Sequence, residues 1–192
     1  MAVDYDIQSY KSVKSWERWL KQNYDKSPGL WLRLAKKDSG IASVTYHEAL
    51  EVALCYGWID GQKRSDNAQF WLQKFTPRGK RSLWSKVNRE KIAALSAAGR
   101  MHPAGLLEVQ RAQADGRWEA AYDSARTASV PEDFRAALAA NPAAQAFFTT
   151  LNASNRYAIL FRLQTAKRAA TREKNILKFV AMLEQGKTFH II

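Results

Sequence analysis

The stretch ALCYGWIDGQKRSD, residues 53–66, holds side chains that could perform catalysis. Asp60 follows an apolar pair and precedes a glycine, so it could line a pocket as a general base or hold a cation. Alternatively, its carboxylate pairs with nearby backbone or with an arginine. Cys55 is the only cysteine, and a nucleophilic thiol needs a base in contact. His47 is eight residues away, about 12 Å along a helix, so we expect Cys55 to be a buried core residue.

A second stretch, FTPRGKRSLWS at residues 75–85, combines cations with an aromatic ring. Arg78, Lys80 and Arg81 precede an expected helix, and a helix N-terminus beside cations favours anion binding. Trp84 could stack on a ligand ring, or it could be a core residue next to a solvated basic loop. The full set of candidate anion-binding residues is Arg64, Arg78, Lys80, Arg81, Trp84, Lys167 and Arg172.

Basic residues are concentrated in two segments of the chain. The 192 residues carry 30 Lys and Arg against 18 Asp and Glu, a formal net charge of +12. Residues 62–91 contain nine basic and two acidic side chains, and residues 155–178 contain seven basic and one acidic. Such a surface attracts nucleic acid, anionic lipid or acidic metabolites, unless the charge only keeps the protein dispersed. If the two segments meet, Lys167 and Arg172 would extend one basic groove.

Several classes of site and of protein find no support in the sequence. The three histidines and one cysteine lie far apart, without the paired spacing of metal ligands. No glycine-rich phosphate loop, serine elbow or Walker motif is present, so we expect neither a metal nor a cofactor. No apolar run approaches the roughly 20 residues of a membrane span, and the first residues lack a secretory pattern. With a single cysteine, these features predict a cytoplasmic protein.

Helix and strand patterns are mixed in the first part of the chain. Residues 13–24 predict a helix, and GLWLRLAKK, residues 29–37, predicts a strand. A capping box at Thr45 opens a helix that ends at Gly57, and a hairpin follows with its turn at residues 65–68. Further helices are expected from a cap at Ser82 through Trp84 to Gly99, and from Pro103 to residue 109.

Only helices are expected after a weakly patterned junction at residues 115–130. Pro131 starts the first, Asn141 caps the second, and Ser154 and Thr171 cap two more. The predicted fold class is α+β, with a mixed helix and strand domain that contains a small antiparallel sheet, followed by a small all-helical C-terminal module. The predicted domain bounds are residues 1–120 and 121–192.

Five motifs together resemble the YdeI/OmpD-associated family, also called bacteriocin-protection proteins, over nearly the whole chain. The resemblance implies a bacterial protein with an α+β N-terminal part and a small helical C-terminal module. The family names imply an association with tolerance to bacteriocins or antimicrobial peptides and with an outer-membrane porin, but no catalytic mechanism. The motifs are ALCYGWIDG (53–61), FTPR (75–78), SLWSKVN (82–88), AAGRMHPAG (97–105) and TAKRAATREK (165–174).

Three functional hypotheses follow. The leading one is a non-enzymatic accessory or stress-tolerance protein that binds an anionic partner through a basic groove. The alternative is an enzyme that acts on an acidic small molecule, with Asp60 as the base and Arg78 as the anion anchor. The third is an interaction module whose C-terminal helices dock another protein through apolar surface.

Overall fold

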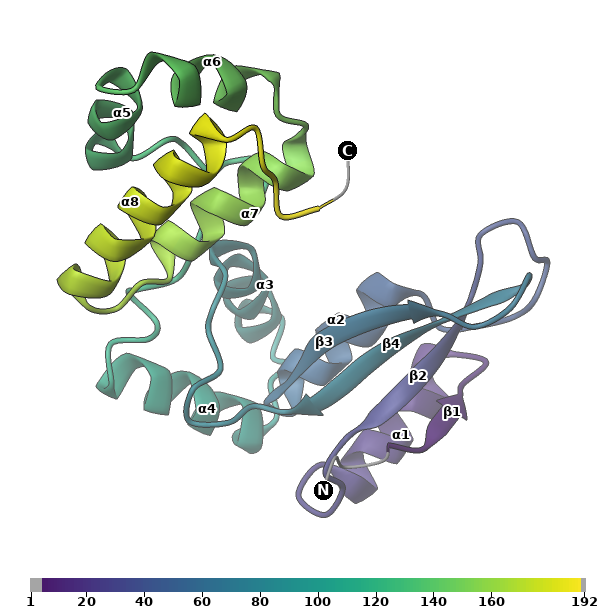
Figure 1. The fold of residues 1–192 in the computed structure, drawn as a ribbon. Coiled ribbons are helices and arrows are strands. Elements are labelled where there is room, and N and C mark those ends of the chain that lie inside the picture. Colours follow the sequence, from purple (N-terminus) through teal and green to yellow (C-terminus); the bar gives the residue numbers. More distant parts are fainter. Residues whose placement is uncertain (1–4, 191–192) are drawn as a thin grey trace. The chain divides into compact units, whose positions relative to one another are not determined.

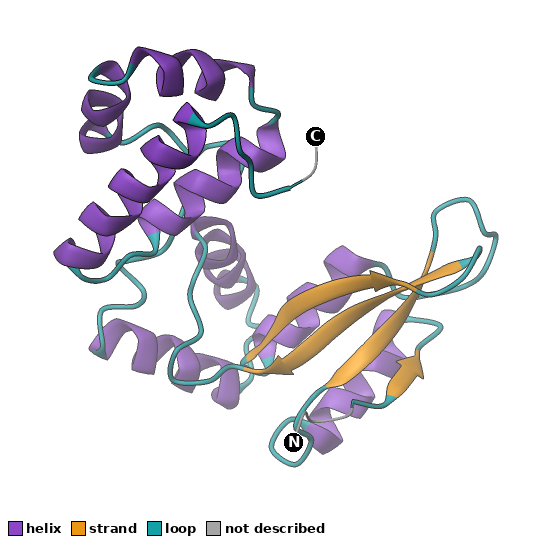
Figure 2. Cartoon of the chain, viewed as in Figure 1, coloured by secondary structure: helices purple, strands orange, loops and turns teal. Residues whose placement is uncertain are grey.

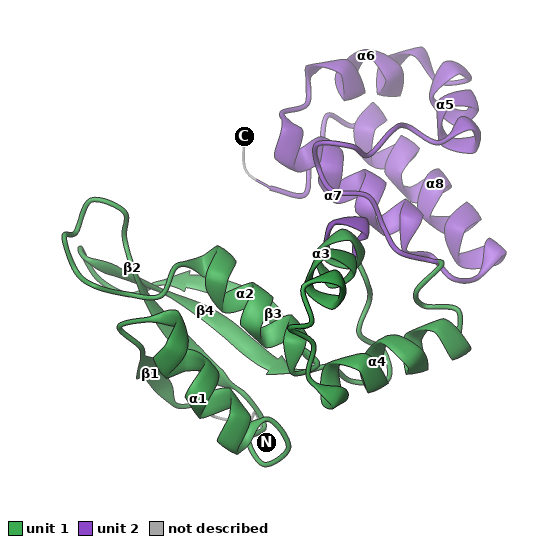
Figure 3. Ribbon diagram, turned by 180° about the vertical axis from the view of Figure 1, so that it is seen from behind, with its two compact units in different colours: residues 1–84, 88–119 green, residues 85–87, 120–192 purple. Residues whose placement is uncertain are grey.

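The chain forms two compact units in the computed structural model, which describes residues 5–190. The first unit comprises the residues up to Trp84 together with 88–119, and the second comprises residues 85–87 together with those from Ala120 onward (Figure 3). Within the described residues, the strands all belong to the first unit, whereas the regular elements from Ala120 onward are helices (Figure 2). The fold class is therefore α+β, as the sequence predicts.

A four-stranded mixed sheet is the main β structure of the first unit (Figure 1). Its strands are β1 (Ile7–Ser9), β2 (Leu30–Ala35), β3 (Trp58–Ser65) and β4 (Phe70–Pro77). Their order is β1-β2-β4-β3, with β1 parallel to β2 and the other neighbours antiparallel. The predicted hairpin is β3 and β4, whereas the three-residue strand β1 is too short to give a sequence pattern. β3 contains a bulge: between Asp60 and Lys63 it has one residue more than the facing part of β4, between Phe75 and Gln73.

Two helices, α1 (Val13–Asn23) and α2 (Tyr46–Cys55), cover one face of this sheet. Figure 3 shows them in front of the sheet, and Figure 1 shows the sheet from its other side. The indole nitrogen of Trp16 in α1 donates to the carbonyl of Ala49 in α2 at 3.1 Å. The same ring lies 5.7 Å from that of Phe75 in β4, centroid to centroid. The core of this unit therefore lies between the sheet and these two helices.

Both ends of α2 are formed as the sequence predicts. The backbone nitrogen of Thr45 donates to the Glu48 carboxylate at 2.9 Å, and the Thr45 hydroxyl accepts from the Glu48 backbone at 3.4 Å. The first of these hydrogen bonds lowers the pKa of Glu48 below its usual value. At the other end, Gly57 has a φ of 76°, the left-handed conformation that glycine accepts without strain.

Two helices that follow the hairpin differ from their predicted bounds: α3 (Lys86–Ala97) and α4 (Pro103–Ala114). The prediction that Ser82 caps a helix containing Trp84 is wrong, because α3 begins at Lys86 and Trp84 lies before it. The Ser82 hydroxyl instead accepts from the Gly79 backbone at 2.9 Å and closes a turn. α4 begins at Pro103 as predicted, but it continues to Ala114 rather than ending at residue 109.

The C-terminal part of the chain is helical, as predicted. Its helices are α5 (Glu132–Ala139), α6 (Pro142–Thr150), α7 (Ala153–Gln164) and α8 (Ala169–Glu184). Pro131 and Asn141 occupy the positions before α5 and α6. The predicted cap at Ser154 is wrong, because α7 is capped by Asn152, which accepts from the Asn155 backbone at 2.9 Å. The predicted cap at Thr171 is also wrong, because α8 begins at Ala169.

The helices of the second unit share an apolar core. The Phe134 and Phe148 rings meet edge to face at 5.6 Å in that core. None of the helices in the described chain has the length and apolar composition of a membrane span. The buried core residues are Phe134, Leu138, Ala144, Phe148, Leu151, Ile159, Leu163, Phe179 and Leu183.

Candidate anion-binding site

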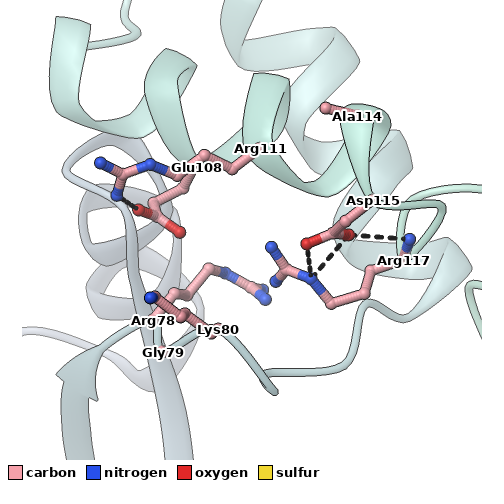
Figure 4. A pocket seen from close by; sticks show the side chains of 8 residues that line it. All are labelled: Arg78, Gly79, Lys80, Glu108, Arg111, Ala114, Asp115 and Arg117. Atoms are coloured by element: carbon pink, nitrogen blue, oxygen red, sulfur yellow. Dashed lines mark hydrogen bonds and ion pairs between the residues drawn. The ribbon is translucent and has the colours of Figure 1, made fainter.

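The first unit contains a cavity of about 530 Å³ between the loop after β4 and the end of α4 (Figure 4). Four cationic and two acidic side chains line it, so its formal charge is +2. An excess of cations in a concave site favours an anionic ligand. The lining residues are Arg78, Gly79, Lys80, Glu108, Arg111, Ala114, Asp115 and Arg117.

Arg78 is held in a fixed position by its own loop. It directly follows β4, and its backbone nitrogen donates to the carbonyl of Gly57 at 3.0 Å. Its side chain is buried, and one guanidinium nitrogen donates to the carbonyl of Leu83 at 3.1 Å. The guanidinium carbon lies 3.5 Å from the centre of the Trp84 ring, which is a cation–π contact. The Arg78 guanidinium is therefore ordered by the protein itself.

Trp84 is a core residue, which is one of the two roles that the sequence left open. It is 2% exposed, and its ring meets that of Trp118 edge to face at 4.8 Å. A ring with so little exposed surface has no free face on which a ligand could stack. Trp84 therefore contributes to the site by supporting Arg78.

Arg117 is the second buried arginine of the cavity. It is 6% exposed, and its Nε lies 2.8 and 2.7 Å from the two carboxylate oxygens of Asp115. Its Nη1 donates to the carbonyl of Ser82 at 3.2 Å, next to the carbonyl of Leu83 that Arg78 uses. Figure 4 shows the guanidinium groups of Arg78 and Arg117 pointing toward one another. One short loop thus aligns both cations.

The remaining cations of the cavity are exposed. Arg111 forms an ion pair with Glu108 at 2.5 Å, one turn earlier on α4, and its side chain is 60% exposed. Lys80 is also exposed, in the loop after β4. The buried arginines therefore supply fixed hydrogen-bond donors, and the exposed cations add charge at the opening.

Arg64 and Arg81 do not line this cavity. Arg64 lies on β3 opposite Leu72, with its guanidinium carbon 4.3 Å from the centre of the Trp31 ring. Leu72 precedes Arg78 by six residues, about 20 Å along an extended strand. Arg64 therefore belongs to a different surface of the first unit, while Arg81 is an exposed residue of the loop before α3.

Lys167 and Arg172 belong to the second unit. Arg172 donates from Nε to the Asp133 carboxylate at 2.6 Å and from Nη1 to the carbonyl of Leu163 at 2.7 Å. The hydrogen bond from Arg172 lowers the pKa of Asp133 below its usual value. A carboxylate of the same unit thus matches the charge of Arg172, while Lys167 is exposed. A contribution of these two residues to an anion site stays a prediction.

Asp60 lies apart from the cavity. Its carboxylate accepts a hydrogen bond from the Tyr46 hydroxyl at 2.8 Å. Asp60 pairs with Phe75, three residues before Arg78, which separates the two backbones by about 10 Å. Asp60 is not among the residues that line the cavity, so this cavity does not combine it with Arg78.

Cys55 is buried, as predicted, and burial raises the pKa of its thiol above the usual value. Both properties are typical of an inert core cysteine rather than a nucleophile. Among the residues that the structure describes, no group of three or more His, Cys, Asp or Glu side chains could hold a metal ion.

Sequence reasoning missed the residues that α4 and its following turn bring to the cavity. The helix predicted from Pro103 ended at residue 109, so Glu108 lay at its end and Arg111 lay beyond it. Asp115 and Arg117 fell in the weakly patterned junction. Gly116, with a φ of 77°, folds the chain so that Asp115 reaches Arg117. The triplet Asp-Gly-Arg is a turn signal that could have indicated this pair.

Two of the sequence motifs hold α4 against α2. The backbone nitrogen of His102 donates to the carbonyl of Cys55 at 3.1 Å, and the His102 ring stacks on Tyr56 at 4.7 Å. At Gly105, a Cβ atom would lie 2.2 Å from the carbonyl oxygen of Cys55, so only glycine fits. ALCYGWIDG and AAGRMHPAG thus act structurally, by fixing the helix that carries Glu108 and Arg111.

Comparison with known families assigns both parts of the chain. Residues 127–186 match the family described as bacteriocin-protection, YdeI or OmpD-associated, and residues 8–108 match a domain of unknown function (DUF8412). The second match covers more than half of the chain, so the chain belongs to the family of that domain, while its C-terminal part matches the YdeI/OmpD-associated family that the motifs resemble. No curated protein and no solved structure matches it.

The YdeI/OmpD-associated match is shorter than the resemblance suggests. It covers the helices α5 to α8, whereas the four motifs between residues 53 and 105 lie within the match to the domain of unknown function. The cavity takes Arg78 and Lys80 from that domain, while Arg111 and Arg117 lie between the two matched segments.

Proposed function

We propose that the protein is a non-enzymatic accessory protein of bacterial stress tolerance that binds a small anionic ligand between Arg78 and Arg117. The observation that supports this function is the pair of buried guanidinium groups held on the consecutive carbonyls of Ser82 and Leu83. A guanidinium group offers a rigid fork of donors that matches a carboxylate or a phosphate. Because both side chains are already ordered, ligand binding costs little additional conformational entropy.

The size of the cavity favours an acidic metabolite over a polymer as the ligand of this site. Small-molecule sites have volumes of roughly 300–1,000 Å³, and this cavity of about 530 Å³ falls within that range. Its mixed lining of guanidinium groups and carboxylates suits a ligand that has hydroxyl or amino groups in addition to its acid.

The enzyme hypothesis has less support than binding. It requires Asp60 and Arg78 to face one ligand, but Asp60 is hydrogen bonded to Tyr46 and does not line the cavity. The interaction-module hypothesis requires a large apolar patch on the C-terminal helices. Among the described residues of α5 to α8, Leu177 is the one large apolar side chain that is exposed, at 68%, and isolated apolar residues are normal on protein surfaces.

The family description supports a role in protection against bacteriocins. A protein with a net charge of +12 repels cationic peptides, so we propose that protection is indirect and depends on the anionic ligand. Our proposal includes a cytoplasmic location, which the single, buried cysteine supports.

Isothermal titration calorimetry with citrate, inorganic phosphate and a nucleoside monophosphate tests this function. At least one of these acids should bind at low ionic strength, and binding should weaken in salt because the site is partly open. Arg78→Gln and Arg117→Gln should each reduce affinity at least tenfold, since each removes a charged hydrogen-bond donor. Arg126→Gln, which removes an exposed cation outside the cavity, is the matched control.

Lys80→Gln complements the buried substitutions, because Lys80 is exposed and its replacement does not disturb the core. A reduced affinity in this variant, with an unchanged unfolding midpoint, would support binding in the cavity. If none of the three acids binds, or if folded Arg117→Gln binds as tightly as the original protein, the proposed function is wrong.

A further inference from the structure

The face of the sheet opposite α1 and α2 is not covered by any described helix of the first unit (Figure 1). Residues on this open face alternate along each strand with the buried residues of the other face. The register places Arg33, Leu72 and Arg64 side by side on β2, β4 and β3. Trp31 and Lys74 form the neighbouring row. The open face thus carries aromatic rings among its cations, although the solvated face of a one-sided sheet is usually polar.

Each of three cations on the open face lies against an aromatic ring. The guanidinium carbon of Arg64 is 4.3 Å from the centre of the Trp31 ring. Arg33 lies 5.7 Å from the ring of Phe70, and the ammonium of Lys74 lies 4.2 Å from the ring of Tyr5. These contacts order long side chains that would otherwise be mobile at a surface.

Leu72 indicates that these side chains form a continuous layer. It is 2% exposed although no described helix of the first unit covers its face. Its cross-strand neighbours on this face are Arg33 and Arg64, so the layer that covers it consists of those cations and their rings. The open face is therefore an aromatic and cationic platform above a closed apolar interior.

The charge of the platform is positive. Among the residues that the structure describes, Arg33, Arg64 and Lys74 share one ion-pair partner, Asp66, whose carboxylate lies 3.0 Å from Arg33. Arg33 and Arg64 are two strands apart, about 10 Å at 4.8 Å per strand. A separation of this size fits the successive phosphates of a nucleic acid better than it fits a single small anion.

We propose that this open face binds single-stranded nucleic acid. Bases stack on aromatic rings and on the planes of guanidinium groups, and phosphates contact the cations between them. The stacked pair of Arg64 and Trp31 offers such a plane at the centre of the platform. A duplex hides the faces of its bases, and a lipid headgroup has no base to stack, so the rings distinguish a single strand from either.

The nucleic-acid site is separate from the cavity of the proposed function. It uses β2, β3 and β4, and none of the platform cations lines the cavity. Either site can therefore be present without the other, and one substitution in each distinguishes them.

Fluorescence anisotropy of the full chain with labelled oligothymidylate and oligouridylate tests the proposal. Binding should be measurable at about 50 mM salt and should weaken severalfold at about 200 mM. Arg64→Gln should weaken it at least fivefold. The control is Lys63→Gln, which removes the same charge from the adjacent residue, because Lys63 pairs with Gln73 and lies on the other face of β3. This control should stay within twofold of the original protein.

Trp31→Leu keeps every charge and should also weaken binding, because it removes the ring beneath Arg64. Competition by an unlabelled duplex and by vesicles of anionic lipid should be much weaker than competition by the single strand. The proposal is overturned if neither oligomer binds, if Arg64→Gln and Lys63→Gln behave alike, or if Trp31→Leu binds normally. It is also overturned if duplex or vesicles compete equally, or if affinity falls in Arg117→Gln instead.

Discussion

The guanidinium group of Arg78 is stacked 3.5 Å from the centre of the Trp84 ring, and both side chains are buried. Arg78 ends the hairpin, and Trp84 precedes α3. The contact therefore closes the loop of residues 79–83 on itself and presents the carbonyls of Ser82 and Leu83 to the two arginines of the cavity. Stability and the proposed ligand binding should therefore depend on the same contact.

A double-mutant cycle between Arg78 and Trp84 should reveal this coupling. We expect Arg78→Leu and Trp84→Leu to destabilise the protein non-additively, with a coupling free energy of about 1–2 kcal/mol for a desolvated cation–π pair. Urea unfolding of the original protein, both single variants and the double variant measures it. Additive effects would show that the contact contributes nothing beyond burial.

Gly105→Ala should destabilise the protein by about 1–3 kcal/mol, the usual cost of overpacking. The new Cβ would meet the carbonyl oxygen of Cys55 at 2.2 Å, so α4 has to move away from α2. Gly61→Ala is the control, because its Cβ would be 3.7 Å from the nearest atom, an ordinary contact. Thermal and urea unfolding compare the two variants. If both variants were equally stable, α4 would be able to move away from α2 without loss of unfolding free energy.

The ion pair of Asp133 and Arg172 should give the protein a stability component that is lost in acid. The hydrogen bond from Arg172 lowers the pKa of Asp133 in the folded state below its unfolded value of about 3.9. The stabilisation is therefore complete above the unfolded pKa and disappears as the pH falls through the folded one. Asp133→Asn should reduce the free energy of unfolding at pH 7 and show little difference from the original protein in strong acid.

Glu173→Gln is the matched control for that pH dependence, because Glu173 is an exposed acid next to Arg172 on α8. Denaturant unfolding between about pH 2 and pH 7 gives both curves. A constant difference between Asp133→Asn and the original protein over this range would mean that the ion pair does not titrate with folding.

Limited proteolysis should cut the full chain first after Arg126. The boundary at residues 120 and 121 stays a prediction, and Arg126 is an exposed trypsin site in the irregular segment beyond it. Exposed loops are cleaved before packed helices. Mass spectrometry of the first two fragments, with Arg126→Gln as the control, identifies the cut. Early cleavage inside α5 to α8 would instead mean that the C-terminal helices open independently of this segment.

The sequence predicted those elements whose signals are local. The capping box at Thr45 and the glycine after α2 gave both ends of that helix, because they satisfy its free backbone groups directly. The helix cap predicted at Ser82 was wrong because a serine hydroxyl can close a turn as well as cap a helix, and here it accepts from the Gly79 backbone. The cap predicted at Thr171 was wrong for a similar reason, since a hydroxyl within the first turn of α8 resembles a helix cap in sequence.

The candidate site was predictable only in part. Arg78 and Lys80, two of the predicted anion-binding residues, line the cavity. Arg64 is close to them in sequence but distant in space, because an extended strand advances about 3.3 Å per residue. Arg111 and Arg117 are distant in sequence and close in space. Their position depends on the packing of α4 against α2, which no local pattern of residues encodes.

The bulge in β3 decides which of two adjacent cations belongs to the platform. If the same residues alternated strictly from Asp60 onward, without a bulge, Lys63 would lie on the side of Trp31 and Arg64 would turn toward the helices. A loss of the bulge at unchanged chain length would therefore exchange a stacking guanidinium for a lysine, with the amino-acid composition of the charged tip unchanged. The pairing register of this hairpin, and not only its composition, therefore sets which cation the open face presents.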